Sequence, residues 1–321
     1  MARRLGFLAV ILATVSLLFV VVAARAPWEF LLPFRLMKLA ALIIVGASLA
    51  VATVLFQTLT ANRILTPSLL GFDALYMLIV TLLIQLLGAA GFNALSPLGL
   101  FLMTVVAMSG LGLGLFTALM RMAQKDMIRL VLTGIVIGLL IRSMTEFIQR
   151  IIDPSEFQMV QSMSFARFTQ ADPQMLLLAG LAVLPALAGA WALRHRLDVL
   201  TLGEDAAIGL GERPSRVRRQ AMLAICTLVA VATALVGPLS AGGFAPSSFF
   251  GIIVAAFARM VTPTHRHAIL LPCAAIIGAL VLSGGQFVLE RLLSLDTPLM
   301  VVIELIGGFI FLAILLKRRL A

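Results

Sequence analysis

Residues 174–219 read QMLLLAGLAVLPALAGAWALRHRLDVLTLGEDAAIGLGERPSRVRR. The part up to Leu193 carries no charge, and it has the length of about 20 residues that an α-helix needs to cross the hydrocarbon core of a bilayer. A short polar connection that contains several arginines follows at once. An uncharged apolar run followed by a short basic connection predicts a membrane-spanning helix and a loop outside the bilayer.

The same pattern continues in both directions along the chain. Of the 321 residues 62% are hydrophobic and only 12% are charged, whereas soluble domains have about 45–50% apolar and about 25% charged residues. We therefore predict an all-α polytopic membrane protein with about ten spans, which would use roughly 200 residues and leave no room for a sizeable soluble domain. The chain is expected to form a single transmembrane domain over residues 1–321. The predicted spans lie near residues 6–23, 38–58, 73–90, 98–120, 127–148, 174–193, 219–236, 250–261, 267–285 and 298–316.

The distribution of basic residues predicts how these spans are oriented. Lysine and arginine gather in the cytoplasmic loops of membrane proteins. If both termini are cytoplasmic, most of the 24 lysines and arginines lie on the cytoplasmic side. The exceptions, on or near the outer side, are Arg25, Arg35, Lys38, Arg142, Arg150, Arg167 and Arg291. The basic excess thus sets the topology and, without a basic arm or an aromatic-basic patch, does not indicate nucleic-acid binding.

Several kinds of chemistry are excluded by the residues that the sequence lacks. None of its lysines follows a glycine, so a phosphate-binding GxxxxGK[ST] loop is absent and any use of ATP requires another polypeptide. Cys226 and Cys273 lie inside apolar runs without a CxxC spacing and are predicted to be packing residues. His195, His265 and His267 lie in or beside basic loops, where we expect surface charge. We predict no catalytic residue, no cofactor and no metal site.

The connection at residues 197–212 differs from the other loops. Polar and apolar residues alternate in it at helical spacing, and it closes with Gly209 and Gly211. This pattern predicts a short surface helix with one face available to a partner. A plain cytoplasmic connector, whose charges only fix the topology, would have the same spacing, and the pattern alone leaves both interpretations open.

A few polar residues lie inside or beside the predicted spans: Gln57, Asn62, Gln85, Glu146, Gln286 and Glu304. Polar groups within a bilayer are costly and tend to face a partner helix or a water-filled cavity. Glu304 stands out because it follows Pro298 in an otherwise apolar helix. Both an aqueous pathway and a structural hydrogen bond to a neighbouring helix would explain it.

Several further motifs occur in a characteristic order. They are Arg35–Leu39 (RLMKL), Gln57–Gly71 (QTLTANRILTPSLLG), Leu202–Ala206 (LGEDA), Gly237–Ser240 (GPLS) and Leu305–Gly308 (LIGG). In this order the chain resembles, over nearly its whole length, the permease subunits of type II ABC importers for ferric siderophores, haem and vitamin B12. The segment Asn62–Asp73 is more similar to the iron-siderophore branch than to the vitamin B12 branch.

This resemblance implies the type II ABC importer permease fold and a transport function rather than an enzyme activity. The chain would pass a ferric siderophore inward through the bacterial inner membrane. Its partners would be membrane lipid, a second permease subunit, two ABC ATPase subunits and a periplasmic or lipid-anchored siderophore-binding protein. The alternative is a secondary transporter that couples uptake of a small solute to an ion gradient.

The resemblance also implies roles for individual residues. The ATPase-coupling segment would contain Leu202, Gly203, Glu204, Asp205, Ala206, Gly209 and Gly211. Arg35, Lys38 and Arg291 would dock acidic groups of the binding protein, although basic side chains at helix ends also extend to the membrane surface without a partner. Gly237 and Pro238 begin a gate region at about 237–261, in which Ala241–Ser248 departs from the family pattern. Gln57, Asn62 and Glu304 complete the expected pathway and gate residues.

Overall fold

A computed structural model describes residues 2–22, 27–122, 127–169, 172–239, 249–293 and 297–319, and every regular element in these ranges is a helix. Ten of the helices correspond to the predicted spans: α1 (Ala2–Val21), α2 (Trp28–Leu59), α3 (Phe72–Ala94), α4 (Pro97–Met122), α5 (Met127–Gln149), α7 (Pro173–Ala192), α10 (Pro214–Val236), α11 (Phe249–Val261), α12 (His267–Phe287) and α13 (Leu299–Arg319). The short elements are η1 (Pro67–Leu70), α6 (Pro154–Met163), α8 (Arg194–Leu200), α9 (Glu204–Gly209) and η3 (Val288–Leu292), of which η3 is a single π-helical turn.

The length and composition of the helices agree with a polytopic membrane protein. Within the described ranges, 8 helices are long and apolar enough to cross a membrane, and α11 and the start of α13 form two shorter apolar segments. The 13 residues of α11 make it the shortest of the ten, as its apolar run predicted. At 1.5 Å per residue α11 is about 20 Å long, which is less than the roughly 30 Å of a hydrocarbon core.

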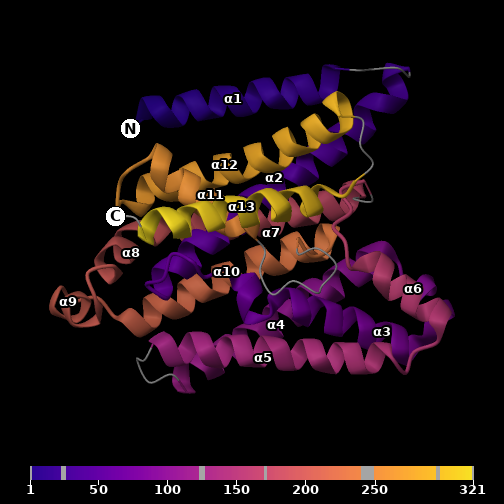
Figure 1. Ribbon diagram of the computed structural model, residues 1–321, viewed down its shortest axis with the longest axis horizontal. Helices are drawn as coiled ribbons and strands as arrows, with labels where there is room; N and C mark the ends of the chain where they lie inside the picture. Colours follow the sequence, from indigo (N-terminus) through magenta and orange to yellow (C-terminus); the bar gives the residue numbers. More distant parts are fainter. Residues whose placement is uncertain are drawn as a thin grey trace.

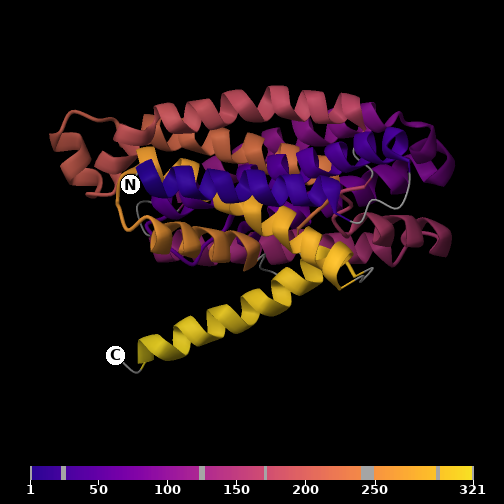
Figure 2. The same ribbon diagram turned by 90° about the horizontal axis from the view of Figure 1, so that it is seen from above.

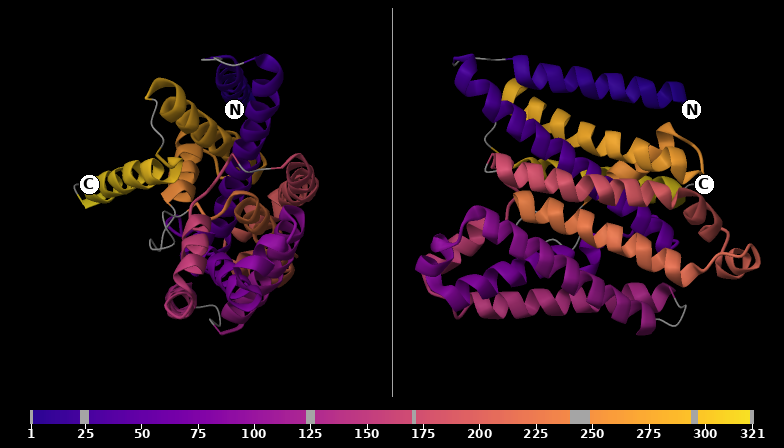
Figure 3. Two further views of the ribbon diagram at one scale, coloured as in Figure 1. Left: turned by 90° about the vertical axis from the view of Figure 1, so that its right-hand side faces the viewer. Right: turned by 180° about the vertical axis from the view of Figure 1, so that it is seen from behind.

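The long helices run along a common axis, and the short helices lie at the two ends (Figure 1). α8 and α9 lie at one end, which we call the α9 end, and α6 lies at the other, the α6 end. α1 begins and α13 finishes at the α9 end, as an even number of crossings requires. Seen from above, α13 leans away from the other helices (Figure 2). α1 and α5 form opposite borders of the bundle (Figure 3).

The centre of the bundle is built on α2, which packs against α7, α10, α11 and α12. Its closest neighbour is the antiparallel α12, because glycines face each other where the two helices cross. A Cβ atom added to Gly46 would lie 2.5 Å from the carbonyl oxygen of Gly278. Small residues allow transmembrane backbones to approach this closely, so that packing rather than side-chain length sets the helix spacing.

The structure corrects three expectations. α2 begins at Trp28, well before residue 38, so Arg35 and Lys38 lie inside the helix and not before it. Between α5 and α7 the chain forms the additional helix α6, where no element was predicted. The segment 197–212 contains parts of two short helices instead of one, because Gly203 interrupts it with a φ of +105°. This left-handed backbone conformation favours glycine over any residue with a Cβ atom.

Candidate functional site

The two short helices at the α9 end present an apolar surface to solvent. Leu202, Ile208 and Leu210 are all more than half exposed, and Asp205 and Ala206 are also exposed. Gly211, with a φ of +82°, turns the chain from α9 towards α10. Most of the predicted coupling residues are therefore exposed, whereas Glu204 is half-buried. Ile208 and Leu210, which were not predicted, add to the apolar surface.

The second short helix is fixed to the start of α10. Glu204, in the first turn of α9, accepts a hydrogen bond from the guanidinium of Arg218 at 3.0 Å. The backbone N–H of Glu212 donates to the carbonyl oxygen of Ala207, whose side chain is buried. α9 is consequently held in one place relative to the bundle, although its outer face is free of contacts within the described residues.

The first short helix is fixed to two core helices through a histidine. His267 Nδ1 lies 2.6 Å from Asp198 Oδ1 of α8, and the backbone N–H of His267 donates to the same oxygen at 2.8 Å. The other ring nitrogen, Nε2, shares a hydrogen bond of 2.8 Å with the hydroxyl of Thr58 in α2. We call Asp198, His267 and Thr58 the His267 clamp. It joins α8 to the start of α12 and to the end of α2.

The expectation that His267 carries surface charge is therefore wrong. Its side chain is only 2% exposed, whereas His195 and His265 are exposed. Because Asp198 and Thr58 provide hydrogen-bond partners for both ring nitrogens, burial leaves neither unsatisfied. The sequence contained one usable signal, since His267 is the polar residue with which a long apolar helix begins.

A cavity of about 930 Å³ lies beside this clamp and between the end of α2, the α8–α9 turn and the α11–α12 loop. We call it the arginine cavity, because Arg63, Arg259 and Arg266 line it. Gln57, a predicted pathway residue, also lines it and donates through Nε2 to the carbonyl oxygen of Arg63 at 2.7 Å. Asn62 instead stabilises the turn after α2, where its Oδ1 accepts from the backbone N–H of Ile64 at 3.0 Å.

The remaining predicted gate residues lie elsewhere. Gly237 ends α10 at the α6 end with a φ of +97°, and a Cβ atom there would lie 3.0 Å from the carbonyl oxygen of Phe165. Pro238 follows it, and Ser240 and the whole of Ala241–Ser248 lie outside the described residues. Glu304 is half-buried on α13. The structure thus does not bring Gln57, Gly237 and Glu304 together into one site.

The three predicted docking residues do come together, at the α6 end. Lys38 forms an ion pair with Glu290 of η3, and Gln286 donates to the same carboxylate at 2.7 Å. Arg35 donates to the carbonyl oxygens of Val20 and Val22 at the end of α1. Arg291, next to Glu290, is half-buried.

Arg35 and Lys38 are only 2% and 7% exposed, so their charged groups are engaged inside the chain. We call Lys38 and Glu290 the Lys38 clamp. Glu290 was not among the predicted residues, although its spacing of four residues from Gln286 places both on one helix face. The position of these residues does not test whether a binding protein docks on them, so docking stays a prediction.

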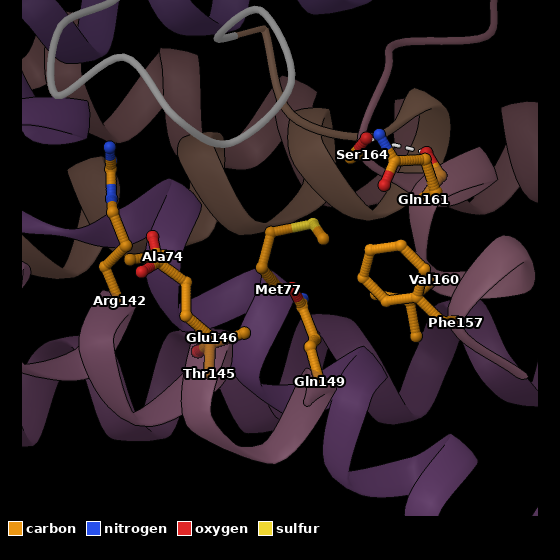
Figure 4. A pocket seen from close by; sticks show the side chains of 10 residues that line it. All are labelled: Ala74, Met77, Arg142, Thr145, Glu146, Gln149, Phe157, Val160, Gln161 and Ser164. Carbon is orange, nitrogen blue, oxygen red and sulfur yellow. Dashed lines mark hydrogen bonds between the residues drawn. The ribbon is translucent and has the colours of Figure 1, made fainter. Parts of the chain in front are cut away.

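Several polar side chains line a small pocket of about 30 Å³ between α3, α5 and α6. Figure 4 shows Arg142, Glu146 and Gln149 in a row along α5, opposite side chains from α6. Gln149 Nε2 donates to the hydroxyl of Thr81 on α3 at 3.3 Å. Glu146, predicted as a polar residue within a span, lines the same pocket.

Comparisons with known proteins agree with this architecture. The petrobactin import system permease protein YclO of Bacillus subtilis (strain 168) is 38% identical over 292 residues, which cover 91% of this chain and 90% of the relative. The petrobactin import system permease protein FatC of Bacillus anthracis is 32% identical over 287 residues, covering 89% of this chain and 78% of the relative.

Among solved structures, an inward-facing conformation of a metal-chelate type ABC transporter has the same fold. The TM-score is 0.83 at 22% sequence identity, and the match covers 98% of this chain and 99% of the other. At this identity the likeness concerns the fold alone. The sequence match to the FecCD transport family extends over residues 5–317, and this chain therefore belongs to the FecCD transport family.

Proposed function

We propose that this chain is the transmembrane permease subunit of an ATP-driven importer that passes a ferric siderophore into the cytoplasm. Family membership and the two petrobactin permease relatives support this class of substrate. The observation that carries the proposal is the His267 clamp, because it connects an exposed short helix directly to the two central helices. A movement imposed on α8 from outside would reach α2 and α12 through these hydrogen bonds.

The α9 end is the cytoplasmic end in this proposal. The connection between α7 and α10 at this end contains Arg194, Arg196 and Arg213, and Arg216 lies in the first turn of α10. Basic connections between spans remain on the cytoplasmic side. One ATPase subunit would contact Leu202, Ile208 and Leu210, and the second ATPase subunit would contact the second permease subunit. Exposed apolar side chains on a helix that is fixed to the bundle, as α9 is, are suited to such a contact.

At the outer end, the binding protein would deliver the iron chelate. Arg291 and its neighbours Arg35, Lys38 and Glu290 carry a net positive charge, which complements acidic groups on a partner. Because Arg35 and Lys38 are buried, Arg291 is the residue of this set best placed for direct contact. Arg35 and Lys38 would contribute to docking through the positive electrostatic potential that their charges produce at this end.

The test uses the tagged full chain, purified gently from its native membrane and then reconstituted. We expect an ABC ATPase to co-purify and ferric petrobactin to enter liposomes only when ATP is supplied. Leu210→Asp, which puts a charge on the exposed α9 surface, should remove the ATPase. Ile151→Asp, at an equally exposed position at the α6 end, is the matched control and should retain it.

A different result would replace the proposal. Uptake by the purified chain that follows a proton or sodium gradient, with no ATPase bound, would identify a secondary transporter. Equal ATPase retention by Leu210→Asp and Ile151→Asp would show that the short helices are not the contact.

A further inference from the structure

The arginine cavity has an excess of positive charge. Its charged lining consists of Arg63, Arg259, Arg266 and a single carboxylate, Asp198. Asp198 is already engaged, because one of its oxygens accepts both the backbone N–H and the ring N–H of His267. The three guanidinium groups therefore share a cavity whose only carboxylate serves another purpose.

The arginines are not neutralised from elsewhere in the described part of the chain. None of the three forms an ion pair there, although Lys38, Arg196, Arg218 and His267 do. Arg259 is half-buried in the last turn of α11, and its charge and that of Arg63 repel each other. Guanidinium groups that line one cavity without a carboxylate of their own attract an anion from solution or from the membrane.

The position and shape of the cavity indicate the kind of anion. It lies where α2 and α11 finish and α12 begins, at one end of these apolar helices. Its wall is amphipathic, since Leu200, Leu202 and Leu270 line it together with the arginines. Its volume of about 930 Å³ is in the range of sites that hold a whole small molecule.

We propose that the arginine cavity is a binding site for a phosphate group. Three arginines against one carboxylate leave an excess of two positive charges, which a dianionic phosphate balances. One guanidinium group can donate two parallel hydrogen bonds to two oxygens of a phosphate. Chloride cannot accept bonds in this geometry, so the site should prefer phosphate to chloride. The phosphate belongs to a soluble phosphate compound or to an anionic phospholipid headgroup, because both offer anionic oxygens to guanidinium groups. A headgroup that is a phosphodiester carries one negative charge and offsets one of the two excess positive charges.

The experiment measures binding to the purified full chain in nanodiscs. Trp191 is a suitable reporter, because its indole N–H donates to the carbonyl oxygen of Ala268, next to His267, at 3.2 Å. Trp28→Phe leaves it as the only tryptophan. In phosphatidylcholine discs, potassium phosphate is titrated against potassium chloride of equal ionic strength. In a second arm, native mass spectrometry counts phosphatidylglycerol bound per chain in mixed discs.

We expect the unmodified chain to bind inorganic phosphate, phosphatidylglycerol or both. Which of the two binds identifies the source of the phosphate group. Arg63→Gln with Arg259→Gln should weaken binding about 100-fold, or about tenfold for each arginine. Arg3→Gln, an exposed arginine on α1 outside the cavity, should leave binding unchanged. Arg63→Lys with Arg259→Lys keeps the charges and guards against misfolding, and it should bind with intermediate affinity.

Equal binding of phosphate and of phosphatidylglycerol by the parent chain and the glutamine variant would overturn the proposal. A response to chloride as large as that to phosphate would do the same. Because the isolated chain is measured, either outcome is independent of whether an ATPase co-purifies.

Discussion

The two ends of the α2–α12 pair are fastened by different chemistry. At the α6 end the Lys38 clamp joins α2 to η3, which directly follows α12, by a charged pair. At the α9 end the His267 clamp joins the end of α2 to the start of α12 by hydrogen bonds around one imidazole. Only the His267 clamp continues to an element outside the bundle, because Asp198 belongs to α8.

This difference indicates that the two ends of the α2–α12 pair have different roles. The glycine contact in the middle and the clamps at both ends hold α2 and α12 together as one rigid unit. A rigid unit can transmit a displacement from one end to the other without absorbing it. In the proposed mechanism, the His267 clamp receives the displacement, and the Lys38 clamp holds the other end of the pair together.

The largest expected effect comes from separating the helices in the middle. In Gly278→Ala the new Cβ atom would overlap the backbone of Gly46 and the side chain of Ala50, so the helices must move apart. We expect a loss of about 3 kcal/mol of stability, measured as a lower Tm in detergent. Gly180→Ala is the matched control on α7, where a Cβ atom meets no neighbour within 4 Å. If both variants melt alike, the close contact is not what fixes the pair.

Breaking the Lys38 clamp should have the second largest effect. Lys38→Met leaves the Glu290 carboxylate, which is about a quarter exposed, without its cation. We expect a loss of about 2 kcal/mol, because an unpaired buried charge costs more than the pair contributes. Adding Glu290→Gln should restore most of this stability. Destabilisation that is simply additive in the double variant would mean that the two residues do not act as a pair.

The smallest change in stability should come from the His267 clamp, with a larger change in transport. Thr58→Val removes the hydroxyl that contacts His267 Nε2 and should cost about 1 kcal/mol. In the reconstituted importer it should increase the ATP hydrolysed per iron transported, while the ATPase remains bound. Thr227→Val is the control, since that hydroxyl bonds only within its own helix in the described chain. An unchanged ratio would place the route of coupling elsewhere.

The helices could be read from the sequence because length and hydropathy are local properties. Each apolar run was long enough to be recognised by itself, and even the short α11 was placed correctly. The start of α2 was missed because Arg35 and Lys38 interrupt its apolar pattern. Their charges are tolerated within the helix through α1 carbonyl oxygens and Glu290, and a local pattern does not reveal such distant partners.

The polar contacts of the candidate site were hidden for the same reason. His267 and Asp198 are 69 residues apart in the sequence, and His267 and Thr58 are 209 apart. Periodicity describes which face of a helix is apolar, but it does not specify which helix covers that face. The exposed segment around Leu202–Ala206 was easier to find, because its glycines and polar residues lie within a few positions of each other.

The Lys38 clamp also has a consequence for biosynthesis. Its two members are separated by 252 residues, so at ribosomal rates of about 5–20 residues per second Lys38 is made tens of seconds before Glu290. During that time the lysine in the second helix has no carboxylate from η3, and its long side chain can reach the membrane surface instead. The central helix pair is consequently among the last contacts of the nascent chain to close.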